Sequence, residues 1–108
     1  MDKIQVEIKA PGATITLNKP ERLNALDVEM WEALAEAAGQ VDRAKDVRVA
    51  VLTGAGGAFC AGLDLKAGST LKRSEHETPP QALADIRAHL KHLQACFSRL
   101  ESCRVPVI

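Results

Sequence analysis

The most informative part of this sequence is the run Val49-Ala50-Val51-Leu52-Thr53-Gly54-Ala55-Gly56-Gly57-Ala58-Phe59-Cys60-Ala61-Gly62-Leu63-Asp64-Leu65. Its β-branched residues predict a buried strand over 47–53, and four glycines follow within residues 53–62. Glycine permits close backbone approach, so main-chain N–H groups beyond the strand can converge on one point and bind an anion. A plain connection whose glycines serve only turn geometry explains the spacing equally well. A dinucleotide-binding loop is disfavoured because the pattern G-x-G-x-x-G is absent.

Two further strands are predicted upstream of this run. Apolar and polar residues alternate over 4–8 and again over 13–18, with the turn pair Pro11-Gly12 between them. The element order is then strand, strand, helix, strand, which is typical of an α/β layer structure. We therefore expect the strands at 4–8, 13–18 and 47–53 to share one sheet.

A helix is predicted between the second and third strands. Asp27 is a suitable N-cap residue, and Glu29 is favourable in the first turn. Apolar residues then recur at helical spacing to about Ala44. We expect this helix, residues 27–44, to pack across the sheet through Trp31 and Leu34.

The second half of the chain contains a polar segment and a long helix. Residues 66–80, which end in a Pro79-Pro80 pair, are predicted to form an exposed, mobile loop. Between residues 83 and 100 the apolar positions step by three and four, which predicts an amphipathic helix with a narrow apolar stripe. Residues 105–108 begin a further strand with no obvious partner, so we expect the chain to be truncated.

Composition excludes several classes of function. The 108 residues fit a single domain, and 14 basic residues balance 14 acidic ones. Zero net charge and 3% aromatic residues argue against a partner nucleic acid. No apolar run reaches the roughly 18–20 residues of a membrane span, and the first residues lack a signal-peptide pattern. Three cysteines without a C-x-x-C pair favour a reduced, cytoplasmic protein. The absence of an apolar span favours a protein with no membrane partner.

Other residues of reactive type have ordinary explanations. Four of zinc-ligand type share one stripe of the long helix, namely Asp85, His89, His92 and Cys96. One helix cannot surround a tetrahedral ion, so a solvated flank is the better interpretation and no metal site is predicted. His76 is a solvated loop residue or a base, and Cys60 is a small packed residue or a nucleophile; in each case we favour the first interpretation.

Three runs together resemble the crotonase superfamily of acyl-CoA hydratases and isomerases. They are residues 15–26 (ITLNKPERLNAL), the run 49–65 quoted above, and residues 103–108 (CRVPVI), in the family's order and with fitting spacing. The resemblance implies an α/β fold of the ClpP/crotonase type, a coiled stack of ββα units. Residues 1–108 would be the N-terminal part of one such domain. It also implies homotrimers or dimers of trimers, an acyl-CoA thioester as substrate, and no cofactor apart from the coenzyme A that the substrate carries.

The resemblance assigns roles to particular positions. The main-chain N–H of Leu63 would be one donor of an oxyanion hole that stabilises a thioester enolate. The carbonyl of Ala61 would meet the adenine amino group of coenzyme A. The remaining coenzyme A contacts would come from Arg22, Leu23, Ala25, Gly62, Asp64 and Leu65. Asp64 is interpreted as a structural cap of the turn that follows rather than as the base.

The second oxyanion donor and the acid/base carboxylates of the family would lie beyond Ile108, so residues 1–108 alone are expected to be inactive. Within the family, the long insert and the long helix resemble dienoyl-CoA isomerases most, with enoyl-CoA hydratases next. Hydrolases, decarboxylases and dehalogenases share the same N-terminal motifs. Two non-enzymatic or unrelated alternatives stay open: an acyl-CoA-binding fragment without catalysis, and a nucleotide-binding βαβ module.

Overall fold

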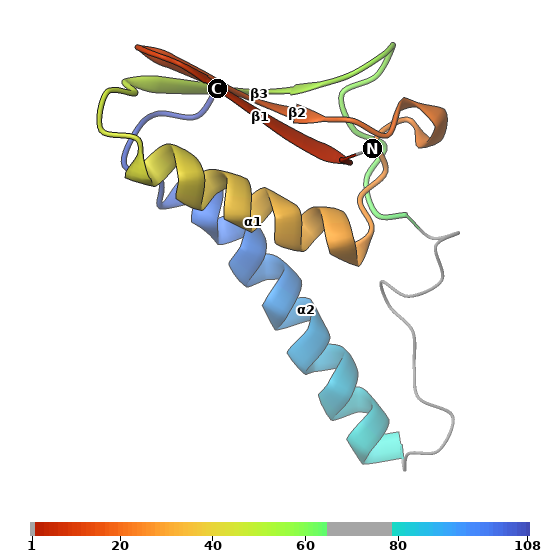
Figure 1. The fold of residues 1–108 in the computed structure, drawn as a ribbon. Coiled ribbons are helices and arrows are strands. Elements are labelled where there is room, and N and C mark those ends of the chain that lie inside the picture. Colours follow the sequence, from red (N-terminus) through yellow and green to blue (C-terminus); the bar gives the residue numbers. More distant parts are fainter. Residues whose placement is uncertain (1, 65–78) are drawn as a thin grey trace.

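The computed structural model describes residues 2–64 and 79–108 and shows an α/β fold (Figure 1). Its sheet contains β1 (Ile4–Lys9), β2 (Gly12–Leu17) and β3 (Val49–Gly54) in that order. β1 and β2 are antiparallel, whereas β2 and β3 are parallel. The predicted common sheet is therefore confirmed, with each strand boundary within two residues of its expected place.

The sheet is buried on one face only. Ala13, Ile15 and Leu17 of β2 point to the covered face and are at most 3% exposed. In β3, Ala50 lies on the same face and is buried, but Val51 points to the other face and is 41% exposed. The expectation of a fully buried strand over 47–53 was therefore wrong. Strand residues alternate between faces, and within the described residues only one face carries a helix layer.

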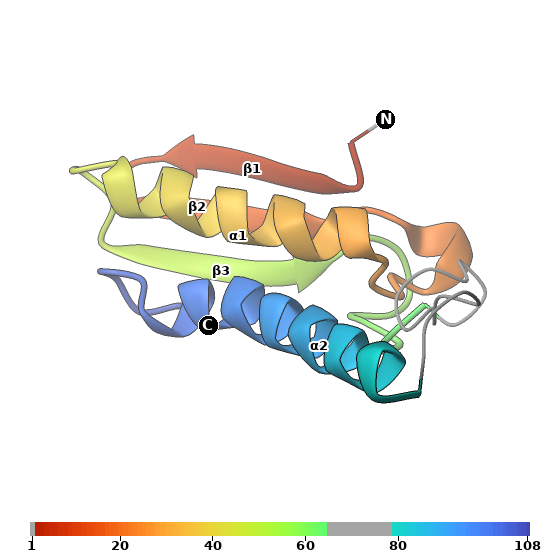
Figure 2. The same ribbon diagram turned by 90° about the horizontal axis from the view of Figure 1, so that it is seen from below.

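Helix α1 (Val28–Arg43) covers the buried face of the sheet (Figure 2). The predicted N-cap is confirmed, because an Asp27 carboxylate oxygen accepts a hydrogen bond from the main-chain N–H of Met30 at 2.8 Å. Met30 and Leu34 are at most 1% exposed, and Trp31 is partly buried against the core. The predicted packing through Trp31 and Leu34 is therefore confirmed.

Helix α2 (Pro79–Glu101) begins earlier than the sequence predicted. Pro79 and Pro80, expected at the end of a loop over 66–80, form its first turn. Proline suits this place because the first turn of a helix has no partner for its N–H groups and proline has the fixed φ of a helix. The rest of the expected loop lies within residues 65–78, outside the described residues.

The two ends of α2 differ in packing. Near its C-terminus, Leu93, Cys96 and Leu100 are buried, and Phe97 packs edge-on against Trp31 of α1 with ring centroids 5.6 Å apart. The N-terminal half extends away from the sheet and α1 (Figure 1), and Leu83 is 69% exposed. The apolar stripe is therefore only half covered within the described residues.

The last residues pair with β3. Ala50 N–H donates to the Pro106 carbonyl at 2.9 Å, and Ile108 N–H donates to the Ala50 carbonyl at 2.9 Å, which makes a parallel bridge between Ala50 and Val107. The segment was expected to lack a partner, but the free edge of β3 provides one. Among the described residues, no helix is long and apolar enough to cross a membrane.

Candidate active site

Two segments far apart in the sequence meet beyond the ends of β2 and β3. A short 3-10 helix, η1 (Pro20–Arg22), leads into Leu26, which bridges to Leu63 in parallel fashion. Leu26 N–H donates to the Gly62 carbonyl at 2.7 Å, and Asp64 N–H donates to the Leu26 carbonyl at 2.9 Å. Alternate N–H groups of an extended segment point in opposite directions, so the N–H of Leu63 points away from Leu26.

The N–H of Leu63 has no acceptor within residues 2–64 and 79–108. It lies beside a hollow of about 340 Å³ at this end of the molecule. The hollow is lined by both segments, with Glu21, Arg22, Leu23, Ala25, Ala61, Leu63 and Asp64. Six of the eight predicted site residues therefore line one hollow. Gly62 lies between two of them without lining it, and Leu65 lies outside the described residues.

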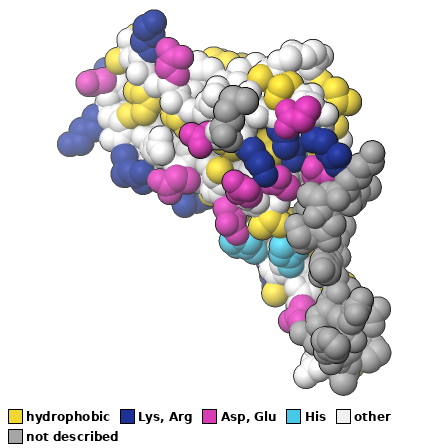
Figure 3. All heavy atoms as spheres, turned by 45° about the vertical axis from the view of Figure 1, so that its right-hand side comes forward, with side chains coloured by type: hydrophobic (Ala, Val, Ile, Leu, Met, Phe, Trp, Pro, Cys, Tyr) yellow, Lys and Arg dark blue, Asp and Glu magenta, His cyan; other side chains and the backbone are white. Residues whose placement is uncertain are grey.

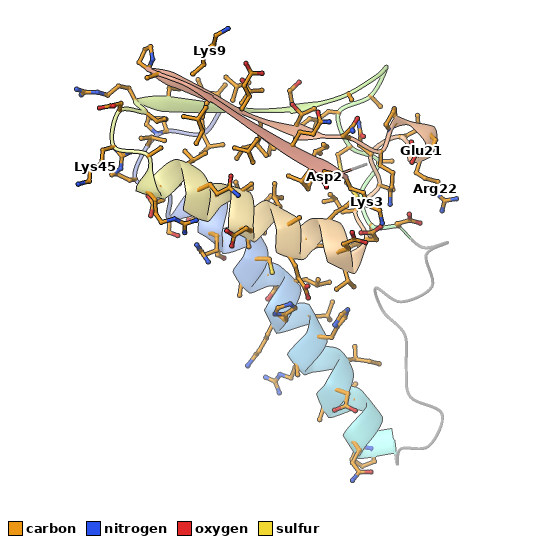
Figure 4. The ribbon with its side chains drawn as sticks, in the orientation of Figure 1. Asp2, Lys3, Lys9, Glu21, Arg22 and Lys45 are labelled. Atoms are coloured by element: carbon orange, nitrogen blue, oxygen red, sulfur yellow. The ribbon has the colours of Figure 1, made fainter. Side chains whose placement is uncertain are left out.

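Charged side chains gather around the hollow. Figure 4 shows Glu21 and Arg22 on η1, at the end of the molecule away from Lys45. Basic and acidic side chains lie next to one another on this face in Figure 3. The Arg22 guanidinium donates to an Asp64 carboxylate oxygen at 2.7 Å. Because the Arg22 side chain is still 36% exposed, it places a positive charge at the edge of the hollow.

A chain of ion pairs runs inward from the hollow. Lys19 Nζ lies 2.8 Å from Asp64 Oδ2 and 3.1 Å from Asp27 Oδ2. Asp27 also receives Lys3 Nζ at 2.9 Å from the outer side. Lys19 and Asp64 are 5% and 4% exposed, and buried charges are tolerated only when they are paired in this way. The turn that Asp64 was predicted to cap lies outside the described residues.

The electrostatics of Asp27 follow from its partners. Burial alone would raise the pKa of its carboxyl. Hydrogen bonds from Lys3, from the Met30 N–H and from Lys19 outweigh burial, and they hold the pKa of Asp27 below its ordinary value. The pKa of Lys3 is raised in turn by its hydrogen bonds to Asp27 and Glu29. At neutral pH this end of the molecule is therefore a fixed array of charges.

Sequence reasoning missed Asn24, which is completely buried. Its side-chain NH₂ donates to the carbonyls of Ala55 and Ala58 at 2.9 Å each, and its Oδ1 accepts from Lys19 N–H at 2.8 Å. Its φ of 58° is left-handed, a conformation that Asn adopts more readily than most residues. The sequence carries no signal for this role, because the contact of Asn24 with the glycine-rich loop follows only from the fold.

Gly54 and Gly62 of the loop are required, the first by close approach and the second by its conformation. A Cβ on Gly54 would lie 2.6 Å from the Ala58 carbonyl oxygen and closer still to that of Phe59. Gly62 has a φ of 99°, which other residues rarely adopt. The expectation that glycine permits close backbone approach here is confirmed. Cys60, weighed as a nucleophile, accepts a hydrogen bond at Sγ from the Gly62 N–H at 3.4 Å.

The stripe of zinc-ligand types on α2 is not assembled into a cluster. His92 Nε2 lies 3.2 Å from Glu32 of α1 and 4.0 Å from Cys96 Sγ. Burial and the nearby Glu32 raise the pKa of the Cys96 thiol, which keeps it protonated. In the part of the chain that the structure describes, no group of three or more such side chains is placed to hold a metal ion. His76 lies outside that part.

Comparison with known proteins places this chain in a family. Residues 7–108 match the Enoyl-CoA hydratase/isomerase family, and the chain belongs to it. A crystal structure of an enoyl-CoA hydratase/isomerase from Xanthobacter autotrophicus Py2 matches 98% of this chain and 37% of its own, with a TM-score of 0.80 and 32% identity. The crotonase-like fold class predicted from the sequence is thereby confirmed.

Two curated relatives have names that specify a reaction. A peroxisomal Delta(3,5)-Delta(2,4)-dienoyl-CoA isomerase of Arabidopsis thaliana is 33% identical over 96 residues, which cover 87% of this chain and 34% of that protein. A 1,2-epoxyphenylacetyl-CoA isomerase of Escherichia coli is 48% identical over 65 residues, covering 60% of this chain and 25% of that protein. The matched part of the chain thus spans about a third of the first relative and a quarter of the second.

Proposed function

We propose that the full-length protein is an enoyl-CoA hydratase or isomerase, and that residues 1–108 supply one wall of its active site as the N-terminal part of a single domain. The observation that carries this proposal is the hollow between η1 and the 61–64 segment. Six predicted contact residues line it, and the Leu63 N–H has no acceptor among the described residues.

The chemistry assigned to this wall is electrostatic. When a proton leaves the acyl chain, negative charge develops on the thioester oxygen, and a main-chain N–H held in place stabilises that charge. Leu63 would donate this hydrogen bond, while Ala61 would receive the adenine amino group through its carbonyl. Arg22, Leu23 and Ala25 would hold coenzyme A along η1. The second oxyanion donor and the acid/base carboxylates would come from residues after Ile108.

Among the reactions of the family, we favour dienoyl-CoA isomerisation. The Arabidopsis relative supports this choice, because its similarity extends over most of the chain, including the long insert. Hydration of enoyl-CoA is the next candidate. Trimeric assembly, independence of any further cofactor and a cytoplasmic location stay predictions from the sequence.

Leu63 provides the test, because its proposed role needs the backbone and not the side chain. In the full-length protein, Leu63→Ala keeps the N–H, and we expect it to keep most activity. Leu63→Pro removes the donor, and we expect turnover to fall by roughly 10²–10³-fold. The measurement is kcat with acyl-CoA substrates, beside circular dichroism and binding of free coenzyme A to show an intact fold and groove.

Cys60→Ser is the control, since it keeps the loop and changes only the thiol; its turnover should stay within a few-fold of wild type. A folded Leu63→Pro variant with the full rate would contradict the assigned role. Loss of activity in Cys60→Ser would instead indicate nucleophilic catalysis. An acyl-CoA-binding protein without catalysis would bind acyl-CoA and turn nothing over, and a nucleotide-binding module would bind NAD or ATP instead.

A further inference from the structure

Lys19 lies at the point where three parts of the site meet. It follows β2 and immediately precedes η1, and its side chain is 7% exposed. Its Nζ contacts Asp27 at the N-terminus of α1 and Asp64 in the segment that carries Leu63. A buried lysine needs ionic partners to offset its desolvation. Two carboxylates from different elements therefore hold this ammonium group and are held by it.

Asp64, one of the two partners of Lys19, directly follows Leu63, the proposed oxyanion donor. The two carboxylate oxygens of Asp64 receive different cations: Oδ2 receives Lys19 from the interior, and Oδ1 receives Arg22 from the edge of the hollow. The carboxylate is thus fixed between an internal anchor and a residue proposed to touch coenzyme A. The Leu63 N–H belongs to the peptide unit of the Gly62 carbonyl, which accepts from the Leu26 N–H at 2.7 Å. Asp64 is bonded to the other side of Leu63, so its orientation also constrains the chain there.

We propose that Lys19 is a positioning residue, which fixes the Leu63 N–H against the thioester oxygen by anchoring Asp64 to the N-terminus of α1. This inference rests on the function proposed above. Lys19 itself makes no contact with substrate in this proposal. Because Lys19 acts through Asp64, its loss should disturb the alignment of the Leu63 N–H in the transition state and leave the affinity for coenzyme A unchanged.

The contacts separate this role from a simple contribution to stability. Without the ammonium group, Asp64 still has Arg22 at 2.7 Å, and Asp27 still has Lys3 at 2.9 Å. Neither carboxylate is left as an isolated buried charge, so the fold is expected to survive. Asp64 would then lose its link to the N-terminus of α1, and the chain at Leu63 would lose one of the contacts that align it.

Lys3 offers a matched control for the test. Both lysines donate to Asp27 Oδ2, but Lys3 also contacts Glu29 and its side chain is 35% exposed. In the full-length protein, Lys19→Met and Lys3→Met remove the same charge from the two sides of one carboxylate. Steady-state kinetics give kcat and KM for each variant. The infrared stretch of a ¹³C-labelled thioester carbonyl in bound crotonyl-CoA reports its hydrogen bonding directly.

For Lys19→Met we expect kcat to fall by roughly 10²-fold, the scale of a small misplacement of a catalytic group. KM should stay within a few-fold of wild type, and the carbonyl stretch should return toward its value in free crotonyl-CoA. Lys3→Met should leave all three unchanged. A wild-type kcat and carbonyl stretch in Lys19→Met would overturn the proposal, as would equal losses in both variants.

Asp27→Asn keeps the proposal falsifiable if Lys19→Met does not fold. Asn retains the Oδ1 that caps Met30 but loses the Oδ2 acceptor that receives both Lys19 and Lys3. The Lys3→Met variant measures the effect of losing the Lys3 contact alone. We expect the same loss of kcat and the same carbonyl shift, and wild-type values would overturn the role of Lys19. Failure of the proposed function itself is a different result: wild-type protein that neither shifts the carbonyl of crotonyl-CoA nor turns over acyl-CoA removes both proposals.

Discussion

Asn24 connects the two segments of the site by hydrogen bonds alone. Its side chain joins the backbone at Lys19 to the carbonyls of Ala55 and Ala58, in a position with no solvent exposure. This one amide therefore ties the glycine-rich loop to the backbone at Lys19.

Replacement of Asn24 by Ala should be strongly destabilising. It removes three hydrogen bonds, of which the one from the Lys19 N–H is buried and the two to the Ala55 and Ala58 carbonyls are partly buried, and Ala is less suited to the left-handed φ of 58°. We expect a loss of about 2–4 kcal/mol in the free energy of unfolding, measured by urea denaturation. Asn18→Ala is the control, since Asn18 makes one exposed contact to the Asp2 carbonyl, and it should cost less than about 0.5 kcal/mol.

Asp27 predicts a pH dependence of stability. The pKa of its carboxyl is lower in the folded protein than its ordinary value of 3.8, so protonation favours the unfolded state. Its contribution is fully present above the unfolded pKa and is lost as pH falls through the folded pKa. The difference in unfolding free energy between wild type and Asp27→Asn should therefore be constant from about pH 5 to 7 and shrink below about pH 4. A difference that grows on acidification would contradict this sign.

At the scale of elements, Gly39 and Gly54 differ in whether their surroundings leave room for a Cβ atom. Gly39 lies buried inside α1, and an added Cβ would meet only the ends of the Arg99 and Arg43 side chains, at 2.8 and 3.2 Å. Those ends can move. Gly54 ends β3, and there the added Cβ would meet the main-chain carbonyls of residues 58 and 59, which cannot move without rebuilding the loop.

Alanine at these two positions should accordingly change stability in opposite directions. Gly39→Ala should stabilise the protein by about 0.5–1 kcal/mol, because glycine is a poor helix residue. Gly54→Ala should destabilise it by about 1–3 kcal/mol, as overpacking does. Thermal melts of the two variants measure both effects under one condition. Destabilisation by Gly39→Ala would mean that Arg99 is held more firmly than its contacts indicate.

Sequence patterns predicted the elements best where local chemistry decides them. The Asp27 cap, the helix after it and the alternating strands follow from local spacing, and all three are present. The start of α2 was misplaced because a Pro-Pro pair is equally typical of a loop and of a first helical turn. The partner of residues 106–108 was missed because it depends on which edge of the sheet is free, and local patterns do not carry that information.

At the scale of the whole molecule, the site joins residues about 40 positions apart, such as Arg22 and Asp64. Spacing alone left the glycine-rich loop ambiguous between an anion hole and a plain turn; the family resemblance placed η1 beside it. Neither revealed the ion pairs of Lys19 or the amide contacts of Asn24. Pairings between distant side chains follow from the tertiary fold, and a single sequence carries no pattern for them.

A crystal structure of the full-length protein with a bound acyl-CoA that cannot react tests the proposed site most directly. We expect the acyl-CoA to occupy the hollow between η1 and residues 61–64. Its thioester oxygen should lie about 2.7–3.1 Å from the main-chain nitrogen of Leu63, the distance of an oxyanion-hole hydrogen bond. An acyl-CoA bound elsewhere, or a thioester oxygen turned away from Leu63, would contradict the proposed site.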